Sequence, residues 1–598
     1  MNKVSLRLPL ALRIAWAIRT TSHFRCYQLL GVCAVLIVGV RTHAQGVQPA
    51  SNQTVVRSNA AHDLSPALLA LKEAADAATP LDCGEDKLHC GISPESADGD
   101  PDEDTPGNDT ASAATTAMSA ATIQGFSIEQ TEQGPREPVP LVDSFDGLGE
   151  GFSGPQGTMK ARNPSDNSLA VDLNNIVQIV NSRMAVYTKK GDRYDITGKV
   201  LYGPVVTNTI FVGFGGQCEH RTSGDAVVRY DQLAKRWLYV LPIFVRPPDD
   251  PKGPYSMCYA VSQGPDPLGP YYRYEFKRPL FPDYPRPAIW PDGYYVPTSV
   301  GDTVIEKQAC VADRSKMLQG LLATEQCVLI DGVNFLLNAD IDGQALPPDG
   351  APNIMMAVGG TQLKSHFEDD GVYVYKMHVD WVDPSKTSVS LLRKITVAPY
   401  HYLCNGQLTK CVSQPGTDIR LDAQGDKLMQ RLVYRKIGRH EWIAGLHSID
   451  TKGGGGGVRW YEFKLDNHRE PQLYQQGTFA PGGFYRWMPS IGIDRKGDIG
   501  IGYSFGGNPD YTGQRFAARL AKDPKGILTF KESVLAKGHA AQTNTLRWED
   551  YTTTAMDPSD DCTFWYVGDY IQSAGESYRT RIGSFRVPGC SRKHRGLF

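Results

Sequence analysis

The chain has 598 residues, of which 41% are hydrophobic, and its 62 Lys and Arg against 65 Asp and Glu leave a net charge of −3. This balance excludes a chain that is disordered throughout, and the lack of basic excess argues against a nucleic-acid partner. The 60 Gly, 40 Pro and 28 Tyr, with a mean hydropathy of −0.33, favour many short strands joined by turns over a polytopic membrane protein.

The first 44 residues are predicted to be a signal peptide. Basic residues are spread over positions 3–25, residues 28–40 are apolar but too few to span a bilayer comfortably, and Ala44 precedes a cleavage site. An uncleaved anchor is the alternative, because the basic region is long and residues 9–18 form a second apolar run. Either segment would export the rest of the chain. Cleavage would leave a secreted or periplasmic protein with no membrane span.

Residues 45–140 are predicted to be a mostly disordered, acidic linker rich in Ala, Ser and Thr. No Lys or Arg occurs between Lys87 and Arg136, and acidic residues cluster within that gap. Such a stretch cannot bury enough apolar surface to offset its conformational entropy. Ser65, an N-cap residue followed by proline, begins a predicted short helix near 66–78.

The cysteines indicate disulfides. Ten of them lie outside the signal peptide, an even number, and the chain has no Cys-x-x-Cys motif. Disulfides between cysteines adjacent in sequence, formed in an oxidising compartment, are therefore favoured over a zinc or redox site. The predicted pairs are Cys83–Cys90, Cys218–Cys258, Cys310–Cys327, Cys404–Cys411 and Cys562–Cys590.

Residues 141–598 are predicted to fold as an all-β propeller of six or seven blades. A polar residue, an apolar strand, a turn aspartate and a second strand recur, and the turn aspartates Asp172, Asp231 and Asp292 are 59 and 61 residues apart. Each repeat has room for about four strands of ordinary length. Radial repetition of four-stranded sheets is a propeller. The repeats begin near residues 166, 225, 285, 431, 489 and 550, with a weaker copy at 352–358.

Several segments of this region resemble a known family. They are VNSRMAVYTKKG, LYGPVVTNTIFVGFGGQCE, VVRYDQLAKRW, FPDYPRPAIWPDGYY and RWEDYTTTAMDPSDDCTFWY. Over about residues 143–590 the chain is similar to secreted bacterial proteins of the β-propeller, sialidase-like type, which mostly have no assigned activity. The resemblance implies the fold and export rather than a chemistry. Glu549 stands where similar proteins commonly have glycine.

Two enzyme signatures are weak in this sequence. Residues 502–506 (GYSFG) match the G-x-S-x-G motif of a nucleophilic serine, but Pro509 follows where a helix would have to begin. A sialidase needs an arginine cluster, a tyrosine nucleophile and an acid. The chain has these residue types without the Ser-x-Asp-x-Gly-x-x-Thr-Trp turns that mark sialidase blades.

No cofactor is predicted, and the histidines form no HExxH motif. A structural calcium ion could be held by Asp557, Asp560 and Asp561, where carboxylates follow one another in a turn. A plain Asp-Pro turn is the alternative interpretation.

The predicted ligand site is the mouth of the central channel. Residues just before each inner strand should converge there, and a mixed ring of Asp and Arg can bind a polar ligand or a cation. The alternative is that these side chains only pair with one another and with turn amides. The candidates are Asp166, Asn167, Asp225, Arg286, Arg431, Arg486, Asp550 and Tyr551.

The sequence therefore predicts an exported propeller, expected to be a monomer, that binds a polar small molecule or a glycan of the cell envelope at this mouth. A carbohydrate-active hydrolase or lyase is the first alternative, which two facing carboxyl groups at the mouth would favour. A protein-interaction scaffold is the second, and it predicts an apolar patch on the blade edges.

Overall fold

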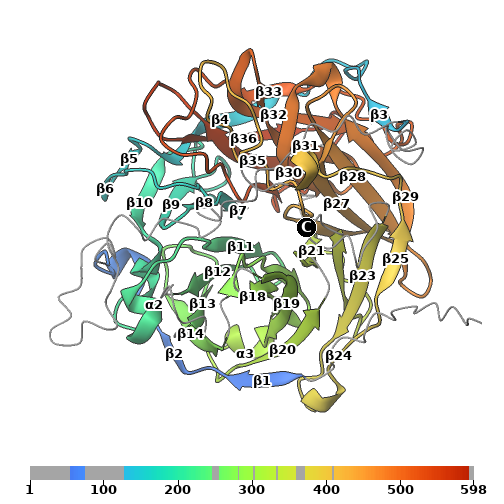
Figure 1. Ribbon diagram of the computed structural model, residues 1–598. Helices are drawn as coiled ribbons and strands as arrows, with labels where there is room; N and C mark the ends of the chain where they lie inside the picture. Colours follow the sequence, from blue (N-terminus) through green and yellow to red (C-terminus); the bar gives the residue numbers. More distant parts are fainter. Residues whose placement is uncertain are drawn as a thin grey trace, which may run out of the picture. The chain divides into compact units, whose positions relative to one another are not determined.

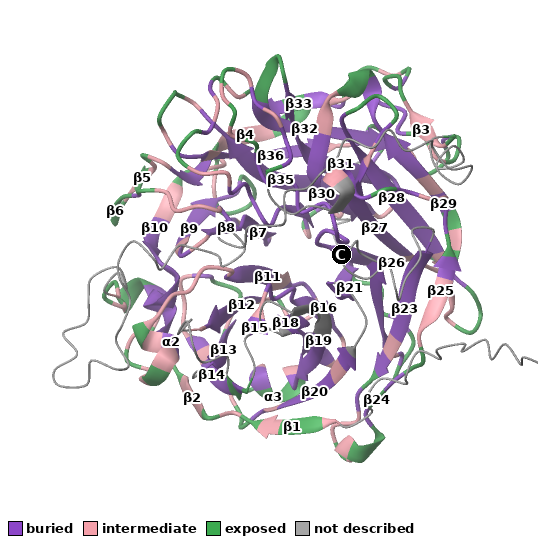
Figure 2. Cartoon of the chain, viewed as in Figure 1, coloured by how far each residue is buried: buried purple, intermediate pink, exposed green. Residues whose placement is uncertain are grey.

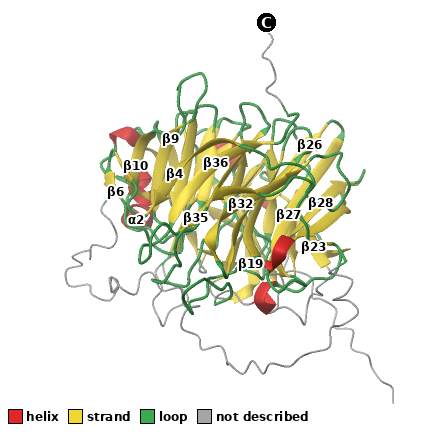
Figure 3. Ribbon diagram, turned by 90° about the horizontal axis from the view of Figure 1, so that it is seen from above, coloured by secondary structure: helices red, strands yellow, loops and turns green. Residues whose placement is uncertain are grey.

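The computed structural model describes residues 54–74, 127–244, 255–279, 282–300, 303–331, 335–358, 371–406 and 410–590. The predicted signal peptide and the predicted pair Cys83–Cys90 lie outside these residues. Strands dominate the described chain and the helices are short (Figure 3). Among the described residues, no helix is long and apolar enough to cross a membrane.

The described strands form seven antiparallel units set around a common centre (Figure 1). The first is β7 (Ser168–Val171), β8 (Asn175–Val180), β9 (Arg183–Thr188) and β10 (Val200–Val206). The second is β11 (Val227–Asp231), β12 (Arg236–Ile243), β13 (Tyr255–Ser262) and β14 (Tyr271–Arg278). The third is β16 (Ala288–Trp290), β17 (Gly293–Tyr295), β19 (Thr303–Ala312) and β20 (Thr324–Asp331), with β15 (Pro282–Asp283) and β18 (Thr298–Val300) beside them.

A ten-stranded sheet contains the fourth and fifth units, which join where β21 and β26 pair in parallel. The fourth is β21 (Leu337–Asp342), β22 (Asn353–Val358), β23 (Gly371–His378), β24 (Ser388–Val389) and β25 (Arg393–Thr396). The fifth is β26 (Leu432–Ile437), β27 (His440–Asp450), β28 (Gly456–Leu465) and β29 (Pro471–Phe479).

The last two units complete the series. The sixth is β30 (Tyr485–Ile493), β31 (Ile499–Gly507), β32 (Asp510–Arg519) and β33 (Ser533–Ala536). The seventh is β34 (Thr553–Met556), β35 (Thr563–Tyr570) and β36 (Arg579–Arg586), with β4 (Leu141–Gly149) as its outer strand. β4 precedes all seven units in the sequence, and it pairs with β36 of the last unit. This pairing joins the two ends of the domain in one sheet and closes the ring of units.

Neighbouring units are joined through their first strands. The backbone N–H of Val228 in β11 donates to Ser168 Oγ in β7 (3.0 Å), and that of Ile289 in β16 donates to Asp340 Oδ1 in β21 (2.8 Å). The backbone N–H of Thr554 in β34 donates to Ser490 Oγ in β30 (2.7 Å). These strands therefore lie side by side around the centre, and the all-β propeller predicted from the sequence is confirmed.

The short elements lie between and beside the units. They are β5 (Ser153–Gly154), β6 (Gly157–Thr158), η1 (Leu68–Ala70), η3 (Thr207–Phe211), α2 (Gly216–His220), α3 (Arg314–Met317), η5 (Pro384–Lys386), η6 (Leu403–Gly406) and η7 (Pro481–Gly483).

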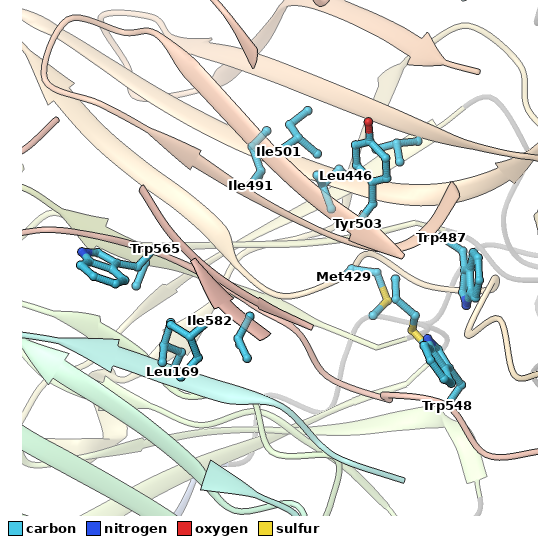
Figure 4. Close-up of a cluster of buried hydrophobic side chains, with 14 of the residues drawn as sticks. Leu169, Met429, Leu446, Trp487, Ile491, Ile501, Tyr503, Trp548, Trp565 and Ile582 are labelled. Atoms are coloured by element: carbon cyan, nitrogen blue, oxygen red, sulfur yellow. The ribbon is translucent and has the colours of Figure 1, made fainter. Parts of the chain in front are cut away.

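The core fills the spaces between units, so both faces of most strands are buried (Figure 2). All six residues of β8 and all eight of β35 are buried. Figure 4 shows part of one cluster, in which Met429 lies near Trp487 and Trp548. Close approach requires glycine at Gly502, because an added Cβ would lie 2.4 Å from the ring of Tyr566 in the next unit.

Part of the predicted linker is strand. β1 (Val55–Ser58) pairs with β20, and β2 (Ala61–Leu64) pairs with β14, so one short segment extends two neighbouring units. β3 (Glu129–Gln130) pairs with β29. The prediction of disorder was wrong there because the outer sheet edges supply backbone partners that composition alone does not show.

Two local predictions were also wrong. In place of the predicted helix near 66–78, the described residues have one 3₁₀ turn, η1. The Ser65 hydroxyl donates to the Pro66 carbonyl (2.6 Å) and does not cap a helix. The weak repeat at 352–358 contains β22, the second strand of the fourth unit, whereas its first strand is β21. The first and the second strand of a unit are both strongly apolar, so the sequence pattern could not distinguish one from the other.

Four predicted disulfides are present. They are Cys218–Cys258, Cys310–Cys327, Cys404–Cys411 and Cys562–Cys590. The last one ties the start of β35 to the chain just after β36, and so stabilises the unit that closes the series. Four disulfides in one domain are typical of a protein from an oxidising compartment.

Candidate functional site

Five of the eight candidate ligand residues meet where the first strands begin. Asp166 and Asp225 lie two residues before β7 and β11, and Asp550 lies three residues before β34. Their φ angles are 49°, 54° and 60°, in the left-handed region that non-glycine residues seldom adopt. Tyr284, ahead of β16, has φ 52°. The same unusual backbone thus recurs at equivalent places, and such strain is concentrated at functional sites.

Hydrogen bonds link these residues into one group. Asp166 Oδ2 accepts from the backbone N–H of Asp225 (3.1 Å), and Asp225 Oδ2 accepts from the backbone N–H of Tyr284 (3.3 Å). The Tyr284 hydroxyl donates to the Asp550 carbonyl (2.5 Å). We call Asp166, Asp225, Tyr284, Arg286, Asp550 and Tyr551 the mouth cluster.

Stacked aromatic and cationic groups form one side of the mouth cluster. The Tyr284 and Tyr551 ring centroids are 4.3 Å apart. The Arg286 guanidinium carbon lies 3.9 Å from the Tyr284 centroid. Phe335 extends the aromatic surface, with its centroid 5.4 Å from that of Tyr284. Lys307 and Lys427 place their Nζ atoms 4.6 and 4.1 Å from the Phe335 centroid.

Three buried side chains of the mouth cluster have polar atoms without a hydrogen-bond partner. They are Asp166 Oδ1, Tyr551 Oη, and Arg286 Nε and Nη2. Asp166, Arg286 and Tyr551 are only 2%, 3% and 1% exposed. Buried polar groups usually have partners, although unpartnered buried atoms also occur elsewhere in the described chain, for example Nε and Nη1 of Arg278.

Burial and neighbouring negative charge control the protonation of the acidic groups in the mouth cluster. Burial, with Asp225 and Asp550 nearby, raises the pKa of Asp166 well above its usual range. Burial, with Asp225 and the Tyr284 hydroxyl nearby, also raises the pKa of Tyr551. Asp166 is therefore a neutral carboxylic acid at pH values at which most aspartates are ionised.

Burial acts in the opposite direction on the cationic side. It lowers the pKa of Arg286, and it lowers the pKa of Lys307 to about 7. An arginine still keeps its charge under ordinary conditions. The lysine is poised to titrate near neutral pH, whereas its unperturbed pKa is about 10.4.

A further layer holds Asp550 in place. Arg547 Nη2 donates to Asp550 Oδ2, and Arg547 Nε donates to Asp422 Oδ2 (2.7 Å). Gln424 Nε2 donates to Asp550 Oδ1 (2.9 Å). Burial raises the pKa of Asp422 to about 8 despite the neighbouring Arg547. These contacts occupy both Asp550 oxygens and fix the carboxylate.

The other three candidates lie outside the mouth cluster. Asn167 donates to Asp569 Oδ1 (2.5 Å) and to Ser165 Oγ (2.8 Å). Arg431 is bound to Asp340 and Asp342 (2.6 and 2.7 Å). Arg486 Nη2 lies 3.0 Å from Glu532. All three side chains are directed to partners within the fold, as the alternative interpretation of the candidates expected.

Ser504 of the GYSFG motif is a core residue. Its hydroxyl donates to Glu549 Oε2 (2.8 Å) and accepts from Trp548 Nε1 (3.0 Å). Gln514 Nε2 also donates to it (2.8 Å), and the residue is fully buried. Glu549 is therefore held by partners within the fold, and burial raises its pKa.

The proposed calcium ligands are engaged by donors of the fold. Asp557 Oδ1 accepts from Lys189 Nζ (2.6 Å), and its Oδ2 accepts from Trp565 Nε1 (3.0 Å). Asp560 Oδ1 accepts from the backbone N–H of Thr563 (2.9 Å), and Asp561 pairs with Arg435. This arrangement is that of an Asp-Pro turn. The calcium site stays a prediction.

Sequence reasoning missed Tyr284, Phe335, Lys307 and Lys427. Tyr284 lies two residues before Arg286 in the segment FPDYPRPAIW, so its place in the repeat could have indicated it. Lys307 lies on β19, a later strand of its unit, and Lys427 follows a long connection. Neither occupies a repeated position, so no pattern in the sequence pointed to them.

Comparisons with known proteins show no family. No protein-family model and no curated protein matches the chain. A neuraminidase-like protein of subtype N10 from influenza A of the little yellow-shouldered bat is 10% identical, with TM-score 0.32 over 60% of this chain and 94% of that one. An ulvan lyase is 9% identical, with TM-score 0.33 over 76% and 94%. A protein of unknown function from Dyadobacter fermentans is 10% identical, with TM-score 0.31 over 75% and 99%. Likeness at this level shows no activity.

Proposed function

We propose that this protein is exported and binds a glycan through the mouth cluster. The observation that carries the proposal is the set of buried, unpartnered polar atoms on Asp166, Arg286 and Tyr551. A fold normally satisfies such atoms itself, because leaving one unpaired costs about 1–3 kcal/mol. A ligand that supplies the missing partners would recover that cost.

The chemistry of the mouth cluster suits a sugar. Hydroxyl groups both donate and accept, so they can pair with the neutral Asp166 carboxyl and the Tyr551 hydroxyl. The rings of Tyr284 and Tyr551 pack on one another and on Arg286. Because the unpartnered polar atoms are shielded from water, a ligand would have to displace neighbouring side chains to reach them.

Binding is tested with the folded, disulfide-bonded protein and a panel of neutral and acidic oligosaccharides, measured by calorimetry. Tyr551→Phe and Asp166→Asn should each weaken binding by about tenfold or more, since each removes a polar partner at the ligand. Tyr503→Phe is the matched control, because its hydroxyl bonds to Glu532 (2.9 Å) outside the mouth cluster. Binding that is absent from the whole panel, or equal in all variants, would overturn the proposal.

A second candidate function is glycan cleavage, as a hydrolase or lyase. The neutral Asp166 beside Asp225 and Asp550 is the observation that favours it, because acid–base catalysis needs neighbouring carboxyl groups in different protonation states. Asp166 would donate a proton to the leaving oxygen. Asp225, the neighbouring carboxyl group, would accept one from water or from a sugar carbon.

Cleavage is tested by incubating the protein with polysaccharides and following reducing ends and the absorbance of unsaturated products. Asp225→Asn should abolish turnover, while the oligosaccharide still binds. Asp146→Asn, at a side chain that is 55% exposed, is the control for loss of one carboxylate. If no product forms from any polysaccharide that binds, the protein is a binding module and not an enzyme.

A further inference from the structure

We infer that the sixth unit carries a separate sugar site, a small surface cleft that holds one pyranose ring of a neutral glycan. The cleft has a volume of about 250 Å³. We call it the rim cleft. It shares no residue with the mouth cluster, so the inference does not depend on binding there. Among the residues that line it are Phe505, Asp510, Tyr511, Arg515, Val534 and Lys537.

Strand direction places the rim cleft on the same side of the propeller as the mouth cluster. Met488 of β30 has the left-handed backbone (φ 46°) that precedes the first strands of other units, and Phe505 of β31 pairs with Arg486 beside it. β32 and β33 are the outer strands of the sixth unit (Figure 1). The rim cleft therefore lies on the mouth side but farther from the centre of the ring.

Apolar and aromatic surface is accessible in the rim cleft. Phe505 is only 4% exposed, whereas Tyr511 and Val534 are 38% and 39% exposed. Single exposed apolar side chains are common, but here two of them border one cleft together with a buried aromatic ring. The C–H face of a sugar ring can cover such a surface, and the tyrosine adds a hydroxyl that hydrogen-bonds at the same place.

Arg515 is fixed beside this surface before any ligand binds. Its guanidinium carbon lies 3.3 Å from the Phe505 ring centroid, and its Nη1 donates to Glu532 Oε1 (2.6 Å). Glu532 is also held by Arg486 (3.0 Å). The Arg515 side chain nevertheless remains 25% exposed. A polar group that is already held in position loses little conformational entropy on binding.

Charges of both signs line the rim cleft. Asp510 supplies oxygens that accept hydrogen bonds, and Lys537 and Arg515 supply N–H groups that donate. Within the described part of the chain, neither Asp510 nor Lys537 forms a salt bridge, and Glu532 offsets part of the Arg515 charge. Hydroxyl groups donate and accept, so a neutral sugar can use every one of these groups. An anion would be repelled by Asp510, and a cation by Lys537.

Close packing fixes the shape of the rim cleft. A Cβ added at Gly538 would lie 2.0 Å from the Thr512 carbonyl oxygen of β32, so the chain after β33 touches that strand and only glycine fits. Small-molecule sites usually measure about 300–1,000 Å³, and the rim cleft is slightly smaller. It therefore has room for one sugar ring, and the rest of the glycan would stay in solvent.

The test uses the folded, disulfide-bonded protein and three neutral probes: cellotetraose, xylotetraose and β-1,4-galactotetraose, titrated by saturation-transfer NMR. At least one should bind, and Tyr511→Ala and Lys537→Met should each weaken it by about fivefold or more. Both side chains are exposed, so the variants should fold. Tyr474→Ala is the matched control and should bind as wild type. This tyrosine of the fifth unit is equally exposed (37%) and also lies against a lysine, Lys525.

Tyr551→Phe, measured with the same probes, separates the rim cleft from the mouth cluster. Weaker binding in the rim-cleft variants alone would support the rim cleft and count against the mouth cluster. Weaker binding in Tyr551→Phe alone would overturn the rim cleft and leave the mouth cluster in place. Weaker binding in both would support two sites. Absence of binding to all three probes, or equal binding in every variant, would overturn the rim cleft.

Discussion

Two buried arginines, Arg286 and Arg431, occupy comparable places next to first strands of the propeller and differ in how the fold treats them. Arg431 binds Asp340 and Asp342 and also donates to the Thr554 carbonyl (3.2 Å). These carboxylates raise its pKa, whereas burial lowers the pKa of Arg286. The difference teaches that residue type and repeat position do not separate a buried arginine that binds carboxylates from one with unpartnered nitrogens. The hydrogen-bond and ion-pair partners of each arginine do separate them.

The largest expected effect is on stability at Arg431. Arg431→Met would leave two buried carboxylates without their cation and should lower the free energy of unfolding by about 3–5 kcal/mol. Arg286→Met removes one hydrogen bond and a stacking contact and should cost about 1–2 kcal/mol. Denaturant titration of both variants checks the order. Equal losses would show that the two sites do not differ as we describe.

The next contrast is in pH dependence, between Asp166 and Asp557. The folded-state pKa of Asp166 is raised, so its contribution to stability is fully present below the unfolded pKa of about 4 and is lost as the pH rises through the folded value. Lys189 lowers the pKa of Asp557, although burial opposes it, so that contribution is present above about 4 and is lost as the pH falls.

Asn variants separate these two slopes. Relative to wild type, Asp166→Asn should become more stable as the pH rises above about 4, because asparagine has no proton to lose. Asp557→Asn should be least stable relative to wild type near neutral pH, where Lys189 loses a charged partner, and should approach wild type in acid. Urea midpoints measured from pH 2 to 8 test this. Slopes parallel to wild type would contradict the assigned protonation states.

The smallest effect distinguishes two tyrosines. Tyr551→Phe removes a hydroxyl that has no partner, so stability should change by less than about 0.5 kcal/mol or rise. Tyr503→Phe removes a bond to Glu532 and should cost about 1–2 kcal/mol. Thermal unfolding of the two variants measures this difference in stability. A larger loss at Tyr551 would mean that its hydroxyl stabilises the fold.

Much of the fold could be predicted because each repeat is marked by residues that lie close together in the sequence. An apolar strand and a turn aspartate recur at most of the first strands, and cysteines that pair lie near one another in sequence. The strands β1, β2 and β3 escaped prediction because they pair with sheet edges far away in the chain. The segment that contains them, residues 45–140, is polar and alanine-rich overall, which indicates a linker when no partner is known.

The candidate site was predicted less completely. Asp166, Asp225 and Asp550 share a repeat position, and the ring arrangement brings them together, so their proximity followed from the repeat. Arg486 lies two residues before Met488, which has the matching backbone in the sixth unit (φ 46°), and its side chain reaches Glu532 near β33. Side-chain direction at that position depends on which acid is nearest, and this is a property of neighbouring units.

The sequence by itself determined the repeated strands, the turn aspartates and the cysteine pairing, because each of these depends on residues close together in the chain. Only the tertiary structure decided which polar atoms remain without partners. Hydrogen-bond satisfaction depends on groups from several units at once, such as Tyr284 from the third, Lys427 from just before the fifth and Asp550 from the seventh. The unpartnered Nε and Nη2 atoms of Arg286 are the result of that packing.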